Sequence, residues 1–268
     1  IWPRPHATYD RGPKLDPRDD RSARLAMTSR RDRFGFDPES IFDRSAEAYQ
    51  SGRPRYPAAF YDALEHAVGR LAKAIVLDIG AGTGISARGL RSRGARVIPM
   101  DPSRLMLSHI GPVLPAVVGR GEQLPIRTGA VDLVTYAQAW HWVTLPAAAV
   151  EAHRVLTPKG SLATWWNVSQ ATTWLDEIES ECGIAPYGAG EHQDNRSVFT
   201  SAGFSAVEGA QIEWVWTVDV PTWVDVASTR SQVAKLGADA APVLERIRAV
   251  VISAFPDGVV LERFTTRL

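Results

Sequence analysis

The sequence contains a single cysteine, Cys182, among its 268 residues. One thiol excludes an internal disulfide and a zinc site built from several cysteines. No apolar run reaches the length of a membrane-spanning helix, and the first residues show no apolar stretch like that of a secretory signal. We therefore expect a cytoplasmic protein without a membrane span.

The formal net charge is zero, because 30 Lys and Arg residues balance 30 Asp and Glu residues. The first 33 residues differ, with nine Lys or Arg, five Asp, four Pro and few apolar side chains. Such a segment buries too little surface to offset the entropy of ordering it. We predict that residues 1–33 are a disordered extension, the alternative being a basic arm for nucleic acid or anionic lipid. Because Met27 opens a run typical of a native start, we expect residues 1–26 to be upstream sequence.

The remaining residues, 34–268, are acidic by four charges and show no basic stripe. A long phosphate backbone is therefore a poor partner, and we expect no nucleic-acid ligand. Their number and the apolar content of 45% suit one sizeable α/β domain with a cap or insertion.

The most informative run is Ile75–Gly84, with the sequence IVLDIGAGTG. Four apolar or β-branched positions surround an acid and lead into glycines at alternate positions. This pattern predicts a buried parallel strand, a tight loop and then a helix. Glycine permits positive φ angles and a close approach of a ligand to the backbone. An acid at the base of the loop disfavours a pure phosphate cradle.

The glycine spacing separates two classes of cofactor. A dinucleotide loop follows G-x-G-x-x-G, and counting from Gly80 its third glycine would fall at Ile85. The chain instead reads Asp-x-Gly-x-Gly-x-Gly, which resembles the first motif of the class I S-adenosylmethionine-dependent methyltransferases. In that family the loop, here Gly80, Ala81 and Gly82, packs on the amino-acid part of the cofactor. Asp78 would then lie near the cofactor ammonium, directly or through water.

The resemblance implies a fold as well. We expect a doubly wound α/β fold with a mostly parallel, seven-stranded Rossmann-like sheet, an antiparallel last strand and a small cap insert. A second strand over 96–101 ends in Asp101, where a carboxylate can accept both ribose hydroxyls. Pro102 follows it at the cofactor edge. The alternative for Asp101 is the N-cap of the next helix, with Pro102 in the first turn.

A third strand is predicted around 116–119, and the loop after it contains Gly121 and Glu122. The same family has an Ala/Gly-Glu-x-Leu-Pro segment here that lines the adenine pocket, which implies that role for both residues. A solvated loop acid is the alternative for Glu122. A fourth strand over 131–136 follows, then a helix over 146–156 and a strand over 161–166.

The segment between that fourth strand and the helix reads AQAWHW. It resembles the Ala-Gln-x-x-His-Trp stretch of the type 11-like methyltransferase branch, which implies cofactor contact by Gln138. Strand ends on the carboxyl side hold ligands in open α/β sheets. We therefore predict a substrate pocket, whose residues are Trp140, His141, Trp142 and Asn167.

His141 is the candidate catalytic base, because an unperturbed imidazole titrates near pH ~6.5. The alternatives are a backbone hydrogen bond or packing between the two neighbouring tryptophans. Residues 34–72 also resemble the type 11-like branch, through a Phe-Asp-x-x-Ala-x-x-Tyr-x-x-x-Arg-Pro-x-Tyr-Pro pattern. There the N-terminal helices lie over the cofactor, which implies that Tyr49 and Arg53 contact the methionine carboxylate.

The resemblance weakens beyond residue 167. We interpret 167–200 as a cap insert that contains a helix over 171–182. A strand over 206–218 would open the closing antiparallel hairpin, and residues 263–268 would be its last strand. Trp214 and Trp216 alternate and should share one face of that strand, where sheet packing is favoured. Because the family runs a few residues further, we expect a shortened C-terminus.

The predicted activity is methyl transfer from S-adenosylmethionine to a small organic acceptor, at oxygen, nitrogen or carbon. An in-line displacement on a sulfonium methyl requires no metal and no covalent nucleophile, since the cofactor supplies the reactive group. Two alternatives stay open. One is a non-catalytic protein that binds S-adenosylmethionine, and the other is an NAD(P)-dependent oxidoreductase, which the glycine spacing disfavours.

Overall fold

The computed structural model describes residues 46–268, apart from 48, 51, 113, 189–194 and 206–207. The predicted extension over 1–33 therefore lies outside the described residues, as does the start of the domain. Helical backbone at 46, 47, 49, 50 and 52 precedes the first full helix. We call residues 46–57 the N-terminal strap. The described residues belong to one compact unit.

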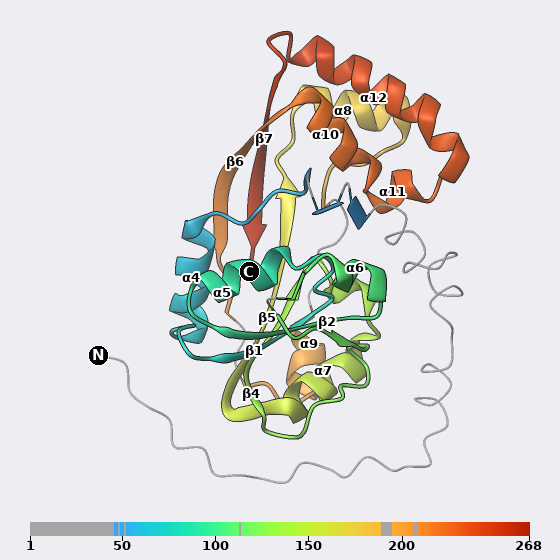
Figure 1. Ribbon diagram of the computed structural model, residues 1–268. Helices are drawn as coiled ribbons and strands as arrows, with labels where there is room; N and C mark the ends of the chain where they lie inside the picture. The colour runs from blue at the N-terminus through green and yellow to red at the C-terminus, as the bar shows by residue number, and fades with distance from the viewer. Residues whose placement is uncertain (1–45, 48, 51, 113, 189–194, 206–207) are drawn as a thin grey trace. The chain divides into compact units, whose positions relative to one another are not determined.

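A seven-stranded sheet runs through the molecule in the order β3-β2-β1-β4-β5-β7-β6 (Figure 1). Its strands are β1 Ile75–Ile79, β2 Arg96–Asp101, β3 Val117–Val118, β4 Val131–Ala137, β5 Leu156–Ser169, β6 Gln211–Asp219 and β7 Val259–Arg267. The first five pair in parallel, whereas β7 runs antiparallel to both β5 and β6. This confirms the predicted seven-stranded sheet with an antiparallel last strand.

Helices cover both faces of the parallel part of the sheet. They are α4 Ala58–Val68, α5 Ile85–Ser92, α6 Arg104–Ser108, the short 3₁₀ helix η1 Trp140–Trp142, α7 Leu145–Val155 and α9 Arg196–Ser201. Alternation along β1 sends Val76 to the core under α4 and α5, and Leu77 to the core under α7. Apart from Asp78, the strand is apolar because both of its faces are buried.

A second group of helices forms a cap beside the long strands β6 and β7 (Figure 1). It comprises α8 Thr173–Cys182, α10 Val220–Ser228, α11 Ser231–Ala234, η2 Gly237–Asp239 and α12 Ala240–Ala254. Its core gathers Trp174, Trp223, Ile247 and Val260. The rings of Trp174 and Trp223 meet edge to face with centroids 5.2 Å apart.

The cap differs from the expected insert over 167–200 in two ways. Most of it lies between β6 and β7, in residues 220–254, and β7 starts at Val259 rather than at 263. The helix α9, inside the expected insert, packs instead on the sheet, where Phe199 stacks 5.3 Å from Trp140. The cap is therefore formed by two separate segments, α8 and the helices between β6 and β7, which share one apolar core.

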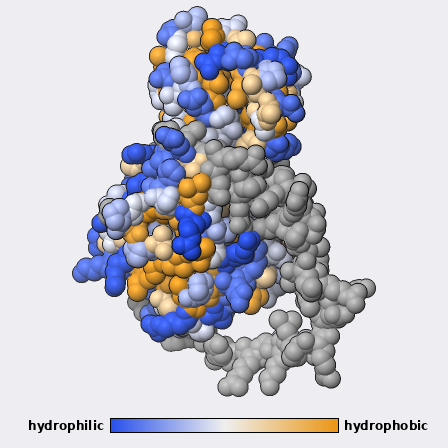
Figure 2. Space-filling model, turned by 45° about the vertical axis from the view of Figure 1, so that its right-hand side comes forward, coloured by the Kyte–Doolittle hydropathy of each residue, from blue (hydrophilic) through white to orange (hydrophobic). Residues whose placement is uncertain are grey.

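Figure 2 shows hydrophobic side chains gathered in patches among hydrophilic ones, in both the upper and the lower part of the face in view. Larger exposed apolar side chains include Val215, Val259 and Leu261 on the outer face of β6 and β7. Among the described helices, none has the length and apolarity that a bilayer crossing requires.

Candidate functional site

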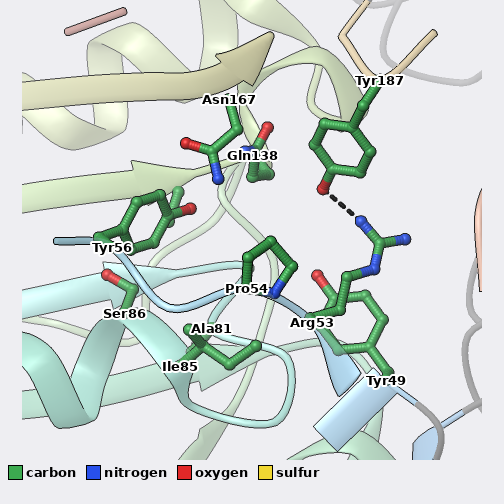
Figure 3. Close-up of a pocket in the computed structure, with 12 residues that line it drawn as sticks. Tyr49, Arg53, Pro54, Tyr56, Ala81, Ile85, Ser86, Gln138, Asn167 and Tyr187 are labelled. Carbon is green, nitrogen blue, oxygen red and sulfur yellow. Dashed lines mark hydrogen bonds between the residues drawn. The ribbon is translucent and has the colours of Figure 1, made fainter. Parts of the chain in front are cut away.

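A pocket, partly open to solvent, lies at the carboxyl ends of β1 and β4 (Figure 3). This is the switch point of the sheet, where open α/β folds bind ligands. The strap, the loop after β1, the start of α5, the end of β4, β5 and the loop after α8 all contribute. The lining residues are Tyr49, Arg53, Pro54, Tyr56, Gly80, Ala81, Ile85, Ser86, Ala137, Gln138, Asn167 and Tyr187.

The loop after β1 depends on its glycines. Gly80, Gly82 and Gly84 have φ angles of +69°, +54° and +84°, a region that side chains disfavour. A Cβ at Gly80 would collide with the Cβ of Ala139. The Ala81 N–H donates to the Met100 carbonyl at 3.0 Å, which ties the loop to β2. The loop therefore presents bare backbone to the pocket.

Asp78 is fully buried at the base of this loop. Its Oδ1 accepts a hydrogen bond from Thr135 Oγ1 at 2.7 Å. Burial raises the pKa of Asp78 to about 7; the hydrogen bond from Thr135 and the Ser86 hydroxyl oppose this shift, and the charge of Asp101 adds to it. Within the described residues, Asp78 Oδ2 and Ser86 Oγ lack partners of good hydrogen-bond geometry. Ligand groups that donate hydrogen bonds would satisfy both.

Asp101 shapes the loop from the neighbouring strand. Its Oδ2 accepts the Gly82 N–H at 2.9 Å, and its Oδ1 accepts the Ser103 N–H at 2.8 Å. The alternative role as a helix N-cap is wrong, because α6 is capped by Ser103, whose Oγ accepts the Met106 N–H at 2.9 Å. Pro102 precedes that cap instead of lying in the first turn.

Gln138 directly follows β4 and has a φ of +57°. This left-handed conformation is costly for a residue with a side chain, and such strain gathers at functional sites. Its N–H donates to the Trp165 carbonyl at 2.9 Å. Both polar atoms of its side-chain amide are buried without a partner among the described residues. The amide is therefore available to a polar ligand.

Gly121 and Glu122 lie in the loop after β3. Glu122 Oε1 accepts the Thr144 N–H at 2.8 Å and so fixes the start of α7. A Cβ at Gly121 would lie 2.7 Å from the Tyr136 hydroxyl, so this loop packs closely on β4. Neither residue belongs to the described pocket lining. Their predicted adenine contacts stay predictions.

The aromatic segment after β4 lies beside the pocket rather than in its described lining. Trp140 is 1% exposed and packs on Tyr136, with ring centroids 4.7 Å apart. His141 Nδ1 accepts a hydrogen bond from Trp166 Nε1 at 3.4 Å, and its ring lies 4.6 Å from that of Trp142. Trp140 is thus a core residue, and the base role of His141 stays a prediction.

Arg53 joins the strap to the cap. Its Nε donates to Thr229 Oγ1 at 2.9 Å and its Nη2 to the Thr229 carbonyl at 3.0 Å. Its Nη1 donates to the Tyr187 hydroxyl (Figure 3). The guanidinium also stacks over the Tyr49 ring at 4.6 Å. The strap is therefore held against the pocket from the cap side.

A buried ion pair supports this wall. Arg230 Nη2 lies 3.6 Å from Glu262 Oε1, and both side chains are nearly inaccessible. Glu262 also accepts hydrogen bonds from Ser169 Oγ and, at 2.7 Å, from Trp223 Nε1. Burial lowers the pKa of Arg230, an effect that Glu262 opposes. The Arg230 guanidinium lies 5.5 Å from the Tyr187 ring.

The predicted residues thus divide between two places. Six of them line the one pocket: Tyr49, Arg53, Gly80, Ala81, Gln138 and Asn167. Others lie behind the loop or outside the described lining: Asp78, Gly82, Asp101, Pro102, Gly121, Glu122, Trp140, His141 and Trp142. Sequence reasoning missed Tyr56 and Tyr187 as lining residues. Tyr56 stands in the Arg-Pro-x-Tyr-Pro run, a signal that could have found it, whereas Tyr187 had no comparable local signal.

This set of groups suits an S-adenosylmethionine molecule. The unsatisfied oxygens of Asp78 and Ser86 match an ammonium, and the Arg53 guanidinium matches a carboxylate. Gly80 keeps this part of the loop free of a side chain, since a Cβ there would collide with Ala139.

Comparison with known proteins agrees with the fold. A family model described as a methyltransferase domain matches residues 77–164. A protein of Mycobacterium tuberculosis H37Rv, named an uncharacterized methyltransferase, is 34% identical over 194 residues, which cover 71% of this chain and 76% of that protein. A methyltransferase-like protein of Schizosaccharomyces pombe is 31% identical over 147 residues, or 53% of this chain and 57% of that protein.

Among solved structures, one assigned as a type II methyltransferase of Anaeromyxobacter dehalogenans matches with a TM-score of 0.58 and 22% identity. It covers 80% of this chain and 95% of its own, and it supports the fold alone. The chain belongs to the class I S-adenosylmethionine-dependent methyltransferases, within the family defined by the methyltransferase domain.

Proposed function

We propose that the protein transfers the methyl group of S-adenosylmethionine to a small organic acceptor by direct in-line displacement. The observation that carries this proposal is the pocket at the switch point, where glycine-loop backbone and unsatisfied polar groups face one cavity. When bound, S-adenosylmethionine supplies an electrophilic methyl group, so the protein needs only to bind, orient and exclude water.

The chain's own residues would hold the cofactor from three sides. Arg53 and Tyr49 bind the methionine carboxylate from the strap, and Asp78 attracts the ammonium from below the loop. Gly80, Ala81 and Gly82 pack on the amino-acid part. These roles agree with the burial of Asp78 and with the position of Arg53 in the pocket lining.

The adenosine end would extend beyond the described lining toward the third strand. Asp101 accepts the ribose hydroxyls beside Pro102, and Gly121 with Glu122 borders the adenine. Asp101 is 9% exposed and already accepts two backbone N–H groups, so it is held rigidly for this role. Gln138 completes the cofactor contacts at the end of β4.

The rest of the pocket would receive the acceptor. Asn167 on β5 lines it, and His141 and Trp142 stand beside it. The described lining mixes apolar, aromatic and polar side chains with one charged group, as small-molecule sites do.

Calorimetric titration with S-adenosylmethionine, S-adenosylhomocysteine and NADH tests the cofactor assignment. We expect the first two to bind with the same one-to-one stoichiometry and NADH not to bind. Binding of NADH alone would reverse the assignment to an oxidoreductase. Incubation with methyl-labelled cofactor and pooled small metabolites, followed by mass spectrometry, should detect label in a small product. Cofactor binding without any labelled product would favour a non-catalytic binding protein.

A further inference from the structure

A hydrogen-bonded relay across the antiparallel part of the sheet fixes the side-chain amide of Asn167. The indole Nε1 of Trp214 on β6 donates to Thr266 Oγ1 on β7 at 2.8 Å. The hydroxyl of Thr266 in turn donates to Asn167 Oδ1 on β5 at 2.7 Å. Because an indole N–H can only donate, it directs the hydroxyl proton toward the amide oxygen. The amide nitrogen, which can only donate, is therefore left for the pocket.

The Tyr56 hydroxyl faces the same space. Figure 3 shows the Asn167 nitrogen and the Tyr56 oxygen pointing into the cavity from neighbouring positions on its wall. Burial raises the pKa of Tyr56 well above its usual value, so the hydroxyl keeps its proton and can donate. Two neutral donors thus converge on one region of the pocket.

The charges around the pocket also favour a ligand that accepts hydrogen bonds and carries negative charge. Among the described lining residues, Arg53 carries the one full charge. Its guanidinium lies 4.9 Å from the Tyr187 ring, and that of Arg230 lies 5.5 Å from the same ring. Glu262 pairs with Arg230 and offsets one of these two charges. Without the cofactor carboxylate that Arg53 would bind, the cap side of the pocket therefore has an excess of positive charge, which attracts anions.

We infer that the acceptor is a small, ionised carboxylic acid whose carboxylate binds between Asn167 and Tyr56, an inference that rests on the proposed methyl transfer. A carboxylate accepts hydrogen bonds and donates none, which matches converging donors. A protonated amine has donors only and would place them against these groups. One carboxylate oxygen forms the bond to the methyl carbon while the methyl–sulfur bond breaks, its electron pair staying on sulfur. No proton is released, and the product is a methyl ester.

Binding tests the recognition step first. The full chain, saturated with S-adenosylhomocysteine, is titrated with phenylacetate, hexanoate and succinate, each beside its amide and the amine of the same skeleton. We expect carboxylates to bind at least about tenfold more tightly than their amides, since charge-assisted hydrogen bonds are about twice as strong as neutral ones. Equal binding of acid and amide, a preference for amines, or no binding by any carboxylate would overturn the inference. Failure of S-adenosylhomocysteine to bind would instead overturn the proposed function.

Variants test the residues. Asn167→Asp keeps the shape of the side chain but places a negative charge in the pocket. The affinity for carboxylates should therefore fall about tenfold or more, and the affinity for the matching amines should rise. The affinity for S-adenosylhomocysteine should stay unchanged. Thr266 acts as a positioning residue: Thr266→Val should weaken carboxylate binding about fivefold, the value of one hydrogen bond, and Thr266→Ser should restore it. The two Thr266 variants test the carboxylate inference if Asn167→Asp fails to fold. Loss of S-adenosylhomocysteine affinity with unchanged carboxylate affinity would assign Asn167 to the cofactor and overturn the inference.

The product gives an independent readout. A methyl ester releases methanol under mild base, and the carboxylate that binds should be the one that gains the labelled methyl group. A base-stable methylated product from a bound carboxylate would show that the carboxylate is recognised but not methylated, which also overturns the inference.

Discussion

The glycine-loop end and the cap end of this pocket are built in opposite ways. At the glycine-loop end, Asp78, the loop and Ser86 all fall within nine consecutive residues of β1, the loop and α5. At the cap end, Glu262 gathers Ser169 and Trp223, which lie 93 and 39 positions away in the chain. One half of a site can thus be a local sequence motif while the other half is formed by segments far apart in the chain.

The two ends also rely on different physics. The loop depends on backbone conformation, since Gly80, Gly82 and Gly84 adopt positive φ angles. The cap wall depends on a buried charge pair, in which Arg230 and Glu262 are held in a low-dielectric core. Changes at the loop should therefore act on cofactor affinity, and changes at the cap on stability.

The largest effect is expected at the cap. Glu262→Ala leaves Arg230 buried without its counter-charge, which costs about 3–5 kcal/mol of unfolding free energy. Chemical denaturation measures this loss. Glu245→Ala is the control, because Glu245 belongs to an exposed pair with Arg248 on α12 and should cost at most ~1 kcal/mol. Similar losses in both variants would contradict a special role for the buried pair.

The next effect is expected at the loop. Gly80→Ala combines a disfavoured φ with the collision at Ala139, a strain of about 3 kcal/mol, so S-adenosylhomocysteine should bind about 100-fold more weakly. Calorimetric titration measures the affinity. Gly69 has φ +88° with no atom within 4 Å of an added Cβ. Gly69→Ala should therefore cost stability and leave binding unchanged; a loss of binding in this control would show that the effect is not local.

A smaller effect should appear with pH. The pKa of buried Asp78 is raised to about 7, so the carboxyl is mostly protonated at pH 6 and mostly ionised at pH 8. If the ionised form attracts the cofactor ammonium, S-adenosylhomocysteine affinity should rise about tenfold over this interval. Asp78→Asn should bind weakly with a flat profile. A wild-type affinity that falls or stays constant with rising pH would contradict the role of Asp78.

The smallest effect is expected at the aromatic segment between the two ends. His141 accepts from Trp166 and lies outside the described lining, so His141→Ala should lower turnover about tenfold or less, with cofactor affinity unchanged. The control substitution is His153→Ala, because His153 lies on α7 and its ring contacts that of Phe204. A fall of about 100-fold or more, the usual worth of a general base, would restore His141 to that role.

Much of the parallel sheet was predictable because each strand and its loop form a local unit. The strand 75–79, the glycine loop and the acids at 78 and 101 all come from short runs whose pattern specifies both conformation and chemistry. Trp140 shows the limit, since an aromatic residue at a strand end suits a pocket as well as a core. Its burial against Phe199 depends on α9, a helix 56 positions further along that no local pattern places there.

The composition of the cap depends on tertiary packing for a related reason. Its helices between β6 and β7 bury their apolar faces on α8, which precedes both strands, so neither segment forms a core alone. Tyr187 enters the pocket through its bond with Arg53, across 134 positions of sequence.

Local sequence was enough to identify the methyltransferase family and the glycine loop after β1, because glycine spacing and strand-end acids act through neighbouring backbone. Only the tertiary structure decided what the rest of the pocket offers. Contacts between segments far apart in the chain set the orientation of the Asn167 amide and the protonation of Tyr56. They also bury Arg230 beside Glu262. Burial and hydrogen-bond direction, which set a side chain's chemistry, exist only after those segments have packed together.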